Sequence, residues 1–126
     1  MSYRGTIIEE SLENKDILKE VLISKTRVEK VVDKHRTPWI KQWTLYTVEI
    51  SEDHADSIAE KISKALDREH AWYVDFKNKT HHYIIFHDKV FFIDRRKKEQ
   101  YDEAKCYGIS LGIPEYQVDF SPDIKE

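Results

Sequence analysis

The chain has 126 residues, of which 40% are hydrophobic and 36% are charged, and its formal net charge is −3. This length is typical of one domain, so we take residues 1–126 as a single unit with a core that needs neither disulfides nor metal. The slightly negative charge argues against broad, nonspecific binding to nucleic acid, which depends on a positive field.

The expected location is the cytoplasm. Cys106 is the only cysteine, so no intrachain disulfide can form. Residues 1–15 lack the apolar core of a signal peptide, and no run approaches the roughly 18 apolar residues of a transmembrane helix. We therefore expect no membrane association, and no motif in the sequence calls for a cofactor.

The N-terminal third predicts strands. Residues 3–9 are compatible with a short strand, and residues 11–18 with one helical turn or a loop. Residues 21–33 alternate between β-branched and charged side chains, as a half-solvated strand does. Residues 39–50 predict a second long strand, and the two should pair as a hairpin around Pro38.

A helix is predicted to start at Ser51, a good N-cap residue followed by Glu52 and Asp53. Its apolar residues recur at helical spacing, which indicates a helix packed on a sheet. The stripe consists of Ala55, Ile58, Ala59, Ile62, Ala65 and Leu66.

Residues 71–96 predict three strands with turns at Asn78-Lys79 and Asp88-Lys89, which would set Asp75 opposite His82. Alternation sorts the side chains onto two faces. One face carries Trp72, Val74, Phe76, His81, Tyr83, Ile85, His87, Val90 and Phe92. The other carries Tyr73, Asp75, His82, Ile84, Phe86, Phe91 and Ile93. Because both faces are apolar, something must cover the second one.

A second helix is predicted over residues 96–111, with Asp94 as its cap, Gly112 at the left-handed C′ position and Pro114 as its stop. Residues 116–120 predict a final strand, and residues 121–126 a frayed tail. We therefore predict an α+β fold with an antiparallel sheet and both helices on one face. From residue 43 onward the order resembles the ferredoxin-like β-α-β-β-α-β order, with extra N-terminal strands.

Asp75 and His82 are the candidate catalytic pair. A carboxylate that hydrogen-bonds an imidazole fixes its tautomer and raises its basicity, as a general base requires. The structural alternative is an ordinary cross-strand polar pair. His81, His82 and His87 do not converge, so no metal site is expected. Cys106 lies mid-helix, where we expect a partly buried structural residue.

The second face of the 71–96 stretch is a candidate partner interface, because an uncovered apolar patch of this size marks an interaction site. Either the strand pair 21–33 and 39–50 covers it, or a second copy of the chain does. The residues concerned are Tyr73, Ile84, Phe86, Phe91 and Ile93.

Two further surfaces are candidates for binding. A ligand pocket is predicted where the Pro38 loop meets the 71–96 stretch, lined by Arg36, Trp39, Trp43 and Tyr73. An RNA-binding face would combine sheet aromatics with the compact basic run Arg95, Arg96, Lys97 and Lys98. The alternative for that run is a solvated helical turn.

The sequence thus favours a binding module for a small molecule or a protein partner, which self-associates if the second sheet face stays uncovered within the chain. An RNA-associated protein is the first alternative, and a small acid/base enzyme that uses Asp75 and His82 is the second. No specific catalytic motif supports the enzyme.

Overall fold

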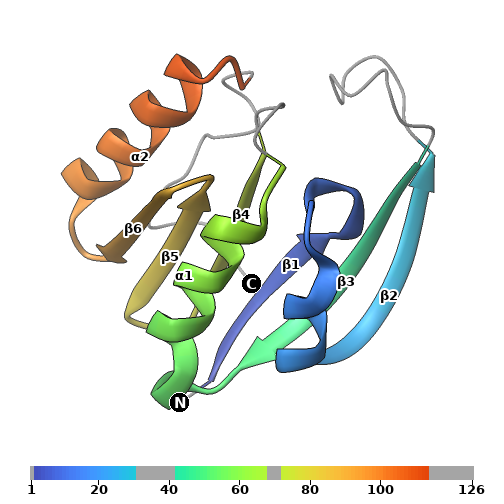
Figure 1. The fold of residues 1–126 in the computed structure, drawn as a ribbon. Helices are drawn as coiled ribbons and strands as arrows, with labels where there is room; N and C mark the ends of the chain where they lie inside the picture. The colour runs from blue at the N-terminus through green and yellow to red at the C-terminus, as the bar shows by residue number, and fades with distance from the viewer. Residues whose placement is uncertain (1, 31–41, 68–71, 114–126) are drawn as a thin grey trace.

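The computed structural model describes residues 2–30, 42–67 and 72–113 (Figure 1). These residues form one antiparallel sheet of six strands in the order β2-β3-β1-β4-β5-β6. The strands are β1 (Tyr3–Ile8), β2 (Leu22–Lys30), β3 (Gln42–Ile50), β4 (Tyr73–Lys77), β5 (His81–Phe86) and β6 (Lys89–Asp94). The fold class is therefore α+β with an antiparallel sheet, as predicted. Among the described residues, no helix is long and apolar enough to cross a membrane.

The hairpin predicted around Pro38 is confirmed as far as its strands are described. β2 pairs with β3 from Leu22–Glu49 to Lys30–Gln42, with a bulge between Ile23 and Lys25. The loop itself, residues 31–41, lies outside the described residues. β1 lies between β3 and β4 and joins the hairpin to the rest of the sheet.

The segment after β1 forms two short 3₁₀ helices, η1 (Glu9–Ser11) and η2 (Lys15–Glu20). In η2 the Asn14 side chain accepts a hydrogen bond from the Asp16 N–H at 2.9 Å and so caps the first turn. Ile17, from η2, is buried in the core together with Leu12, which bridges to Leu66.

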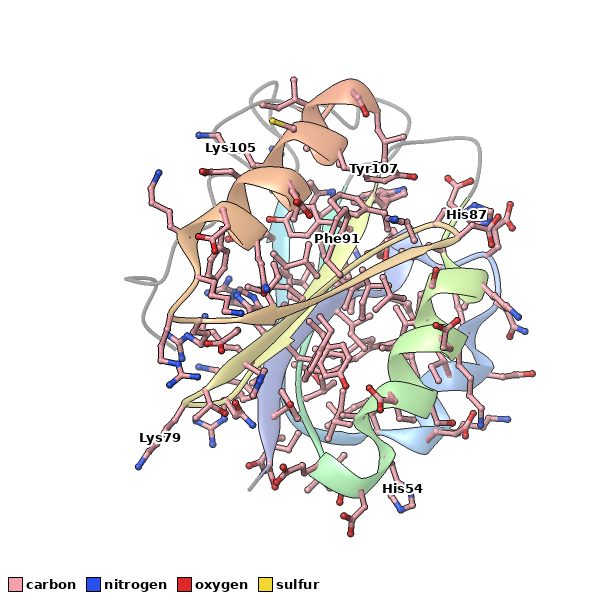
Figure 2. All side chains as sticks on the ribbon, turned by 90° about the vertical axis from the view of Figure 1, so that its left-hand side faces the viewer. His54, Lys79, His87, Phe91, Lys105 and Tyr107 are labelled. Atoms are coloured by element: carbon pink, nitrogen blue, oxygen red, sulfur yellow. The ribbon has the colours of Figure 1, made fainter. Side chains whose placement is uncertain are left out.

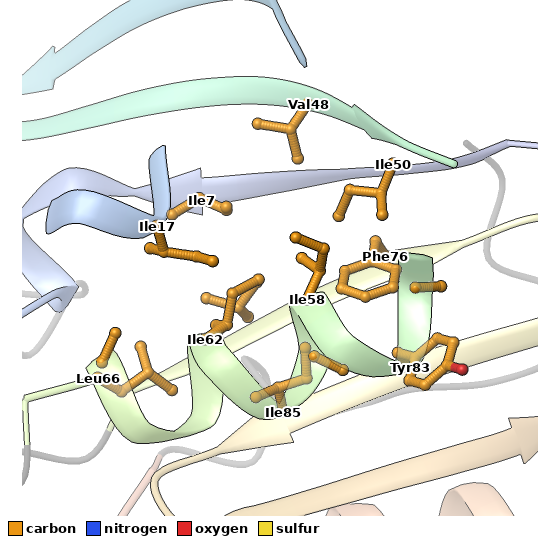
Figure 3. Close-up of a cluster of buried hydrophobic side chains, with 14 of the residues drawn as sticks. Ile7, Ile17, Val48, Ile50, Ile58, Ile62, Leu66, Phe76, Tyr83 and Ile85 are labelled. Carbon is orange, nitrogen blue, oxygen red and sulfur yellow. The ribbon is translucent and has the colours of Figure 1, made fainter. Parts of the chain in front are cut away.

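The first predicted helix is confirmed, although its start differs. Residues Glu52–His54 form the 3₁₀ turn η4, and α1 runs from Ala55 to Ala65. Ser51 has an extended backbone and makes no side-chain cap hydrogen bond, so it marks the start without capping it. Every residue of the predicted apolar stripe is buried. Figure 3 shows Ile58 and Ile62 directed at side chains from the sheet.

The meander β4-β5-β6 keeps the predicted faces but not the predicted register. Lys77 pairs with His82, so the first turn is Lys79-Thr80, and Phe86 pairs with Lys89, so the second is His87-Asp88. Each turn is displaced by one residue, which shifts each pairing by two. A shift of two leaves every side chain on its predicted face, because the side-chain period of a strand is two.

Local chemistry explains both displacements. The Asn78 side chain accepts hydrogen bonds from the N–H groups of Thr80 and His81 at 2.9 and 2.8 Å, so Asn78 stands before the turn. Asp88 adopts the left-handed conformation with φ 58°, which Asp tolerates better than most residues. The residues that form the turns were therefore predicted from the sequence, but their positions within the turns were not.

The two helices lie on opposite faces of the sheet, so the prediction that both cover one face is wrong. α1 packs on the cluster that contains Val74, Phe76 and Ile85. Helix α2 (Lys98–Ser110) packs instead on a cluster made by Ile84, Phe86, Ile93, Tyr101, Ala104 and Ile113. In Figure 2, strands β5 and β6 pass between the two helices. The second face of the meander is thus covered within the chain, by α2 and not by β2 and β3, which extend the same sheet.

The end of α2 follows its prediction closely. Gly112 has φ +95°, its N–H donates to Ile109 O at 2.9 Å, and the Ile113 N–H donates to Gly108 O at 3.2 Å. These are the two hydrogen bonds of a Schellman motif. Asp94 does not cap α2, whose N-cap is Lys97; its carboxylate accepts instead from the Arg96 N–H. The predicted strand 116–120, which the ferredoxin-like order requires, and the tail 121–126 lie outside the described residues.

Candidate functional site

A buried chain of hydrogen bonds joins the sheet to α2 at Asp75, His82 and Tyr101. His82 Nε2 lies 2.7 Å from Asp75 Oδ2, and His82 Nδ1 lies 3.1 Å from the Tyr101 hydroxyl. The side chain of His82 is 0% exposed and Tyr101 is also 0% exposed. The hydrogen bond expected between Asp75 and His82 is therefore present, and it has a third member that sequence reasoning did not find.

The strand register brings Asp75 and His82 together. Asp75 lies directly opposite Ile84, so His82 is its diagonal neighbour on the same face. Diagonal neighbours are about 7–8 Å apart at the backbone, a distance that a carboxylate and an imidazole can bridge. Tyr101 reaches the other ring nitrogen from the first turns of α2, with its ring edge-on to the imidazole.

The direction of each hydrogen bond follows from the groups involved. A carboxylate only accepts, so His82 Nε2–H donates to Asp75, and in the neutral imidazole Nδ1 then accepts from the Tyr101 O–H. Burial raises the pKa of Tyr101, while the charge of the Arg95 guanidinium and its hydrogen bond act to lower it. One continuous chain of polar side chains thus lies at the edge of the core. It runs from the Arg95 guanidinium through Tyr101 and His82 to the Asp75 carboxylate.

Solvent reaches this chain at Asp75. Its side chain is 29% exposed, whereas His82 is enclosed. Tyr73, the next residue on the same face of β4, is held neutral because burial and the Asp75 charge raise its pKa. In this conformation a substrate could touch Asp75 but not His82, so the geometry gives His82 the role of orienting the carboxylate.

Lys77 is the second unusual residue of this region. The residue as a whole is 8% exposed, but its ammonium is not buried, and in the part of the chain that the structure describes no carboxylate or hydrogen-bond acceptor is recorded against it. Its Cα partners are Arg4 on β1 and His82 on β5. Lys77 therefore belongs to the same face as Asp75, two residues along the strand.

Next to the part of the sheet that α2 covers, the same face of the sheet carries polar side chains. Arg4 pairs with Lys77, and Thr6 pairs with Asp75, so these four side chains share one face. We call Arg4, Thr6, Asp75 and Lys77 the polar shelf. Arg4 contacts Glu49 at 3.5 Å in an exposed ion pair, which contributes little energy in water. The shelf lies where the apolar part of the face, covered by α2, ends.

The ligand pocket predicted from Arg36, Trp39, Trp43 and Tyr73 is placed only in part. Arg36 and Trp39 lie outside the described residues. Trp43 packs against the core cluster that contains Trp72, edge-to-face with its ring at 5.9 Å between centroids, whereas Tyr73 packs against the cluster under α2. Trp43 and Tyr73 therefore belong to different cores.

The predicted partner interface is corrected by the position of α2. Ile84 and Phe86 are 0% exposed and Ile93 is 1% exposed, because α2 covers them. Tyr73 and Phe91 are half-buried against the same cluster. A two-fold dimer through this face was predicted because the apolar patch was expected to be uncovered. Since α2 covers the patch, that argument does not hold.

The basic run Arg95–Lys98 is spread over the connection from β6 to α2. Arg95 donates to Asn78 O at 2.6 Å, Arg96 contacts Asp94 at 2.9 Å, and Lys98 contacts Asp102 at 3.6 Å. Much of its charge is therefore engaged locally. The sheet aromatics predicted to stack on bases were Tyr73, Phe86 and Phe91. Phe86 is buried under α2, so it cannot stack on a base.

The remaining candidates resolve simply. In the described ranges no group of three His, Cys, Asp or Glu residues is placed to hold a metal ion. His81 stacks on Phe92, with ring centroids 4.7 Å apart, and His87 lies in the second turn beside Asp88. Cys106 is exposed on α2, where partial burial was expected.

Sequence reasoning missed Tyr101 and Lys77. No local signal marks Tyr101 as a partner of His82, because that contact depends on the face that α2 covers. Lys77 was read as the residue before a turn.

Comparison with models of protein families, with curated proteins and with solved structures finds no match to this chain.

Proposed function

We propose that this chain is a small-molecule-binding module whose ligand site is the polar shelf. The observation that carries the proposal is Lys77, whose side chain is largely buried while its ammonium stays accessible and has no recorded partner among the described residues. A charge-assisted hydrogen bond contributes about 1.5–3 kcal/mol, so an anionic group of a ligand would gain substantially from this position.

Asp75 supplies the second recognition element. His82 occupies one of its carboxylate oxygens at 2.7 Å and fixes its orientation, and a carboxylate retains further acceptor positions. Two residues along a strand are separated by about 6.6 Å. A ligand that carries both an anion and a hydrogen-bond donor can therefore contact Lys77 and Asp75 together. The chemical class that fits is a small zwitterion or hydroxy acid.

The fixed geometry favours binding over catalysis. Asp75 and Lys77 both stand on β4, an inner strand of the sheet, and Asp75 is held by a buried imidazole. Preorganised groups lose little entropy when a ligand binds. An acid/base reaction would require the enclosed His82 to reach its substrate, so the enzyme reading has less support than the binding reading.

Chemical-shift titration tests this proposal with three probes: free glycine, acetate and methylammonium. Glycine carries the anion and the donor, and each of the others carries one. We expect glycine to bind best, with shifts at Asp75 and Lys77. Lys77→Met keeps the buried stem and should weaken glycine and acetate binding by about ten- to a hundredfold.

The matched control is Lys79→Met, which removes the same charge from the exposed turn next to β4. It should leave glycine binding within about twofold. Equal binding of glycine to both variants, or no shift at the shelf with any probe, would contradict the proposal. Asp75→Asn separates the two elements, because it should weaken glycine binding while acetate still binds.

A further inference from the structure

β2 is an outer strand of the sheet, and eight of its nine residues are exposed (Figure 1). Leu22 is 64% exposed and Val28 is 56% exposed. An edge strand presents unpaired backbone N–H and C=O groups, and one with exposed apolar side chains is a template for another strand. The bulge at Ser24 interrupts the edge near one end, which leaves Lys25 to Lys30 as a regular run.

The register with β3 shows that the two faces of β2 differ. Ile23, Thr26 and Val28 pair with Val48, Tyr46 and Thr44, on the face toward α1. On the opposite face lie Lys25, Arg27 and Glu29, which pair with Thr47, Leu45 and Trp43. Between Lys25 and Glu29, the face toward α1 is therefore β-branched and the other is charged, whereas Lys30 lies on the first face and Leu22 on the second.

The charge on β2 selects among possible occupants. The strand carries Lys25, Arg27 and Lys30 against the single carboxylate of Glu29, which Arg27 contacts at 3.5 Å in an exposed ion pair, although the whole chain has a net charge of −3. A second copy is a poor occupant. Antiparallel pairings centred on Lys25 or Thr26 set like charges opposite each other, which is destabilising. Pairings centred on Arg27 or Val28 bring only Glu29 against a cation, so they leave most of the positive charge of both strands unmatched. A segment that brings carboxylates to this face complements it instead.

We propose that β2 binds an extended segment of another protein, which adds to the sheet as a further strand and alternates acidic with apolar residues. Its acidic residues lie beside Lys25 and Arg27, and its apolar residues lie beside Ile23, Thr26 and Val28. Backbone hydrogen bonds supply the general affinity of such strand addition, and the alternating side chains supply the specificity. This surface is separate from the polar shelf.

Selection from a displayed random-peptide library on the immobilised protein tests the inference. We expect enrichment of peptides in which Asp or Glu alternates with Val, Ile, Leu or Phe. A synthetic copy of one enriched peptide should then shift the amide resonances of β2, and its affinity should fall as salt rises. Enrichment of basic peptides, or no enrichment, overturns the proposal.

Two variants locate the site. The double substitution K25E/R27E should weaken the synthetic peptide at least about tenfold, and Val28→Asp should weaken it through the other face. The control K15E/K19E makes the same charge change on exposed positions of η2 and should leave the affinity within about twofold. Equal loss in both double variants means a general charge effect and refutes the strand-addition site. A concentration-dependent dimer that K25E/R27E abolishes would identify a second copy as the occupant and would also refute it.

Discussion

Removing the Tyr101 hydroxyl tests whether the Asp75–His82–Tyr101 chain holds α2 on the sheet. Tyr101→Phe keeps the ring, which is packed at 0% exposure, and deletes the donor that lies 3.1 Å from His82 Nδ1. Because His82 is enclosed, water cannot replace that donor. The imidazole then keeps its bond to Asp75 but loses the donor at Nδ1, and the Arg95 guanidinium loses its hydrogen bond to the same hydroxyl.

The expected cost follows from that geometry. A buried acceptor that loses its partner destabilises a protein by about 1–3 kcal/mol. We therefore expect Tyr101→Phe to lower the free energy of unfolding by about 2 kcal/mol, and the Tm by roughly 5–10 °C. Urea denaturation followed by tryptophan fluorescence measures the change, and an unchanged m-value shows that the denatured state is the same.

Tyr107→Phe is the matched control on the same helix. The Tyr107 ring packs on Phe86 and Phe91, and within the described ranges no hydrogen bond of its hydroxyl is recorded, so the expected change is below about 0.5 kcal/mol. Equal effects of the two substitutions would refute the reasoning. In a His82→Phe background, the additional cost of Tyr101→Phe should also shrink, because the acceptor is already absent.

Three further outcomes follow from backbone and burial. Gly5→Ala should destabilise the protein by about 3 kcal/mol in urea titrations, because the new Cβ would overlap the backbone oxygen of Asp75 and lie 2.7 Å from Phe76 Cβ. Gly112→Ala should cost about 1–2 kcal/mol, because φ +95° strains any L-residue, and thermal unfolding measures it. Burial and the hydrogen bond to Asp56 raise the pKa of Tyr83 above its ordinary value of 10.0. The stability that a neutral Tyr83 contributes is complete below pH 10.0 and is lost as the pH rises through the folded-state pKa. The urea midpoint should therefore fall at alkaline pH, and less steeply in Tyr83→Phe.

Elements whose signals are local could be predicted from the sequence. The α1 stripe required only helical periodicity, and the end of α2 required only Gly112 followed by Ile113. The faces of β4, β5 and β6 were also predictable, since a register error of two residues does not change them. Asp75 and His82 were found for the same reason, as neighbours on one face.

The side of the sheet that each helix covers was not predictable from local pattern. The connection from β6 to α2 is only three residues long, and such a connection can lead to either face. The decisive fact was already visible in the sequence: Ile84, Phe86 and Ile93 form a second apolar face that needs a cover. The ferredoxin-like order placed both helices on one face, so the predicted cover was either the strand pair 21–33 and 39–50 or a second copy of the chain, and not α2. Tyr101 was missed as a consequence.

The limits of α2 explain where the two proposed sites lie. α2 covers the face formed by β4, β5 and β6, and the neighbouring positions Arg4 and Thr6 on β1 are exposed. The boundary therefore falls along β4, where Asp75 faces the buried His82 on one side and the polar shelf on the other. Further along the sheet, β2 forms an edge with little cover on either face. A fold selected for stability alone gains nothing from the Lys77 ammonium there. Lys77→Met should therefore leave the free energy of unfolding unchanged within about 0.5 kcal/mol while it weakens glycine binding at the shelf by about ten- to a hundredfold. A large loss of stability would instead assign Lys77 to the architecture of the sheet.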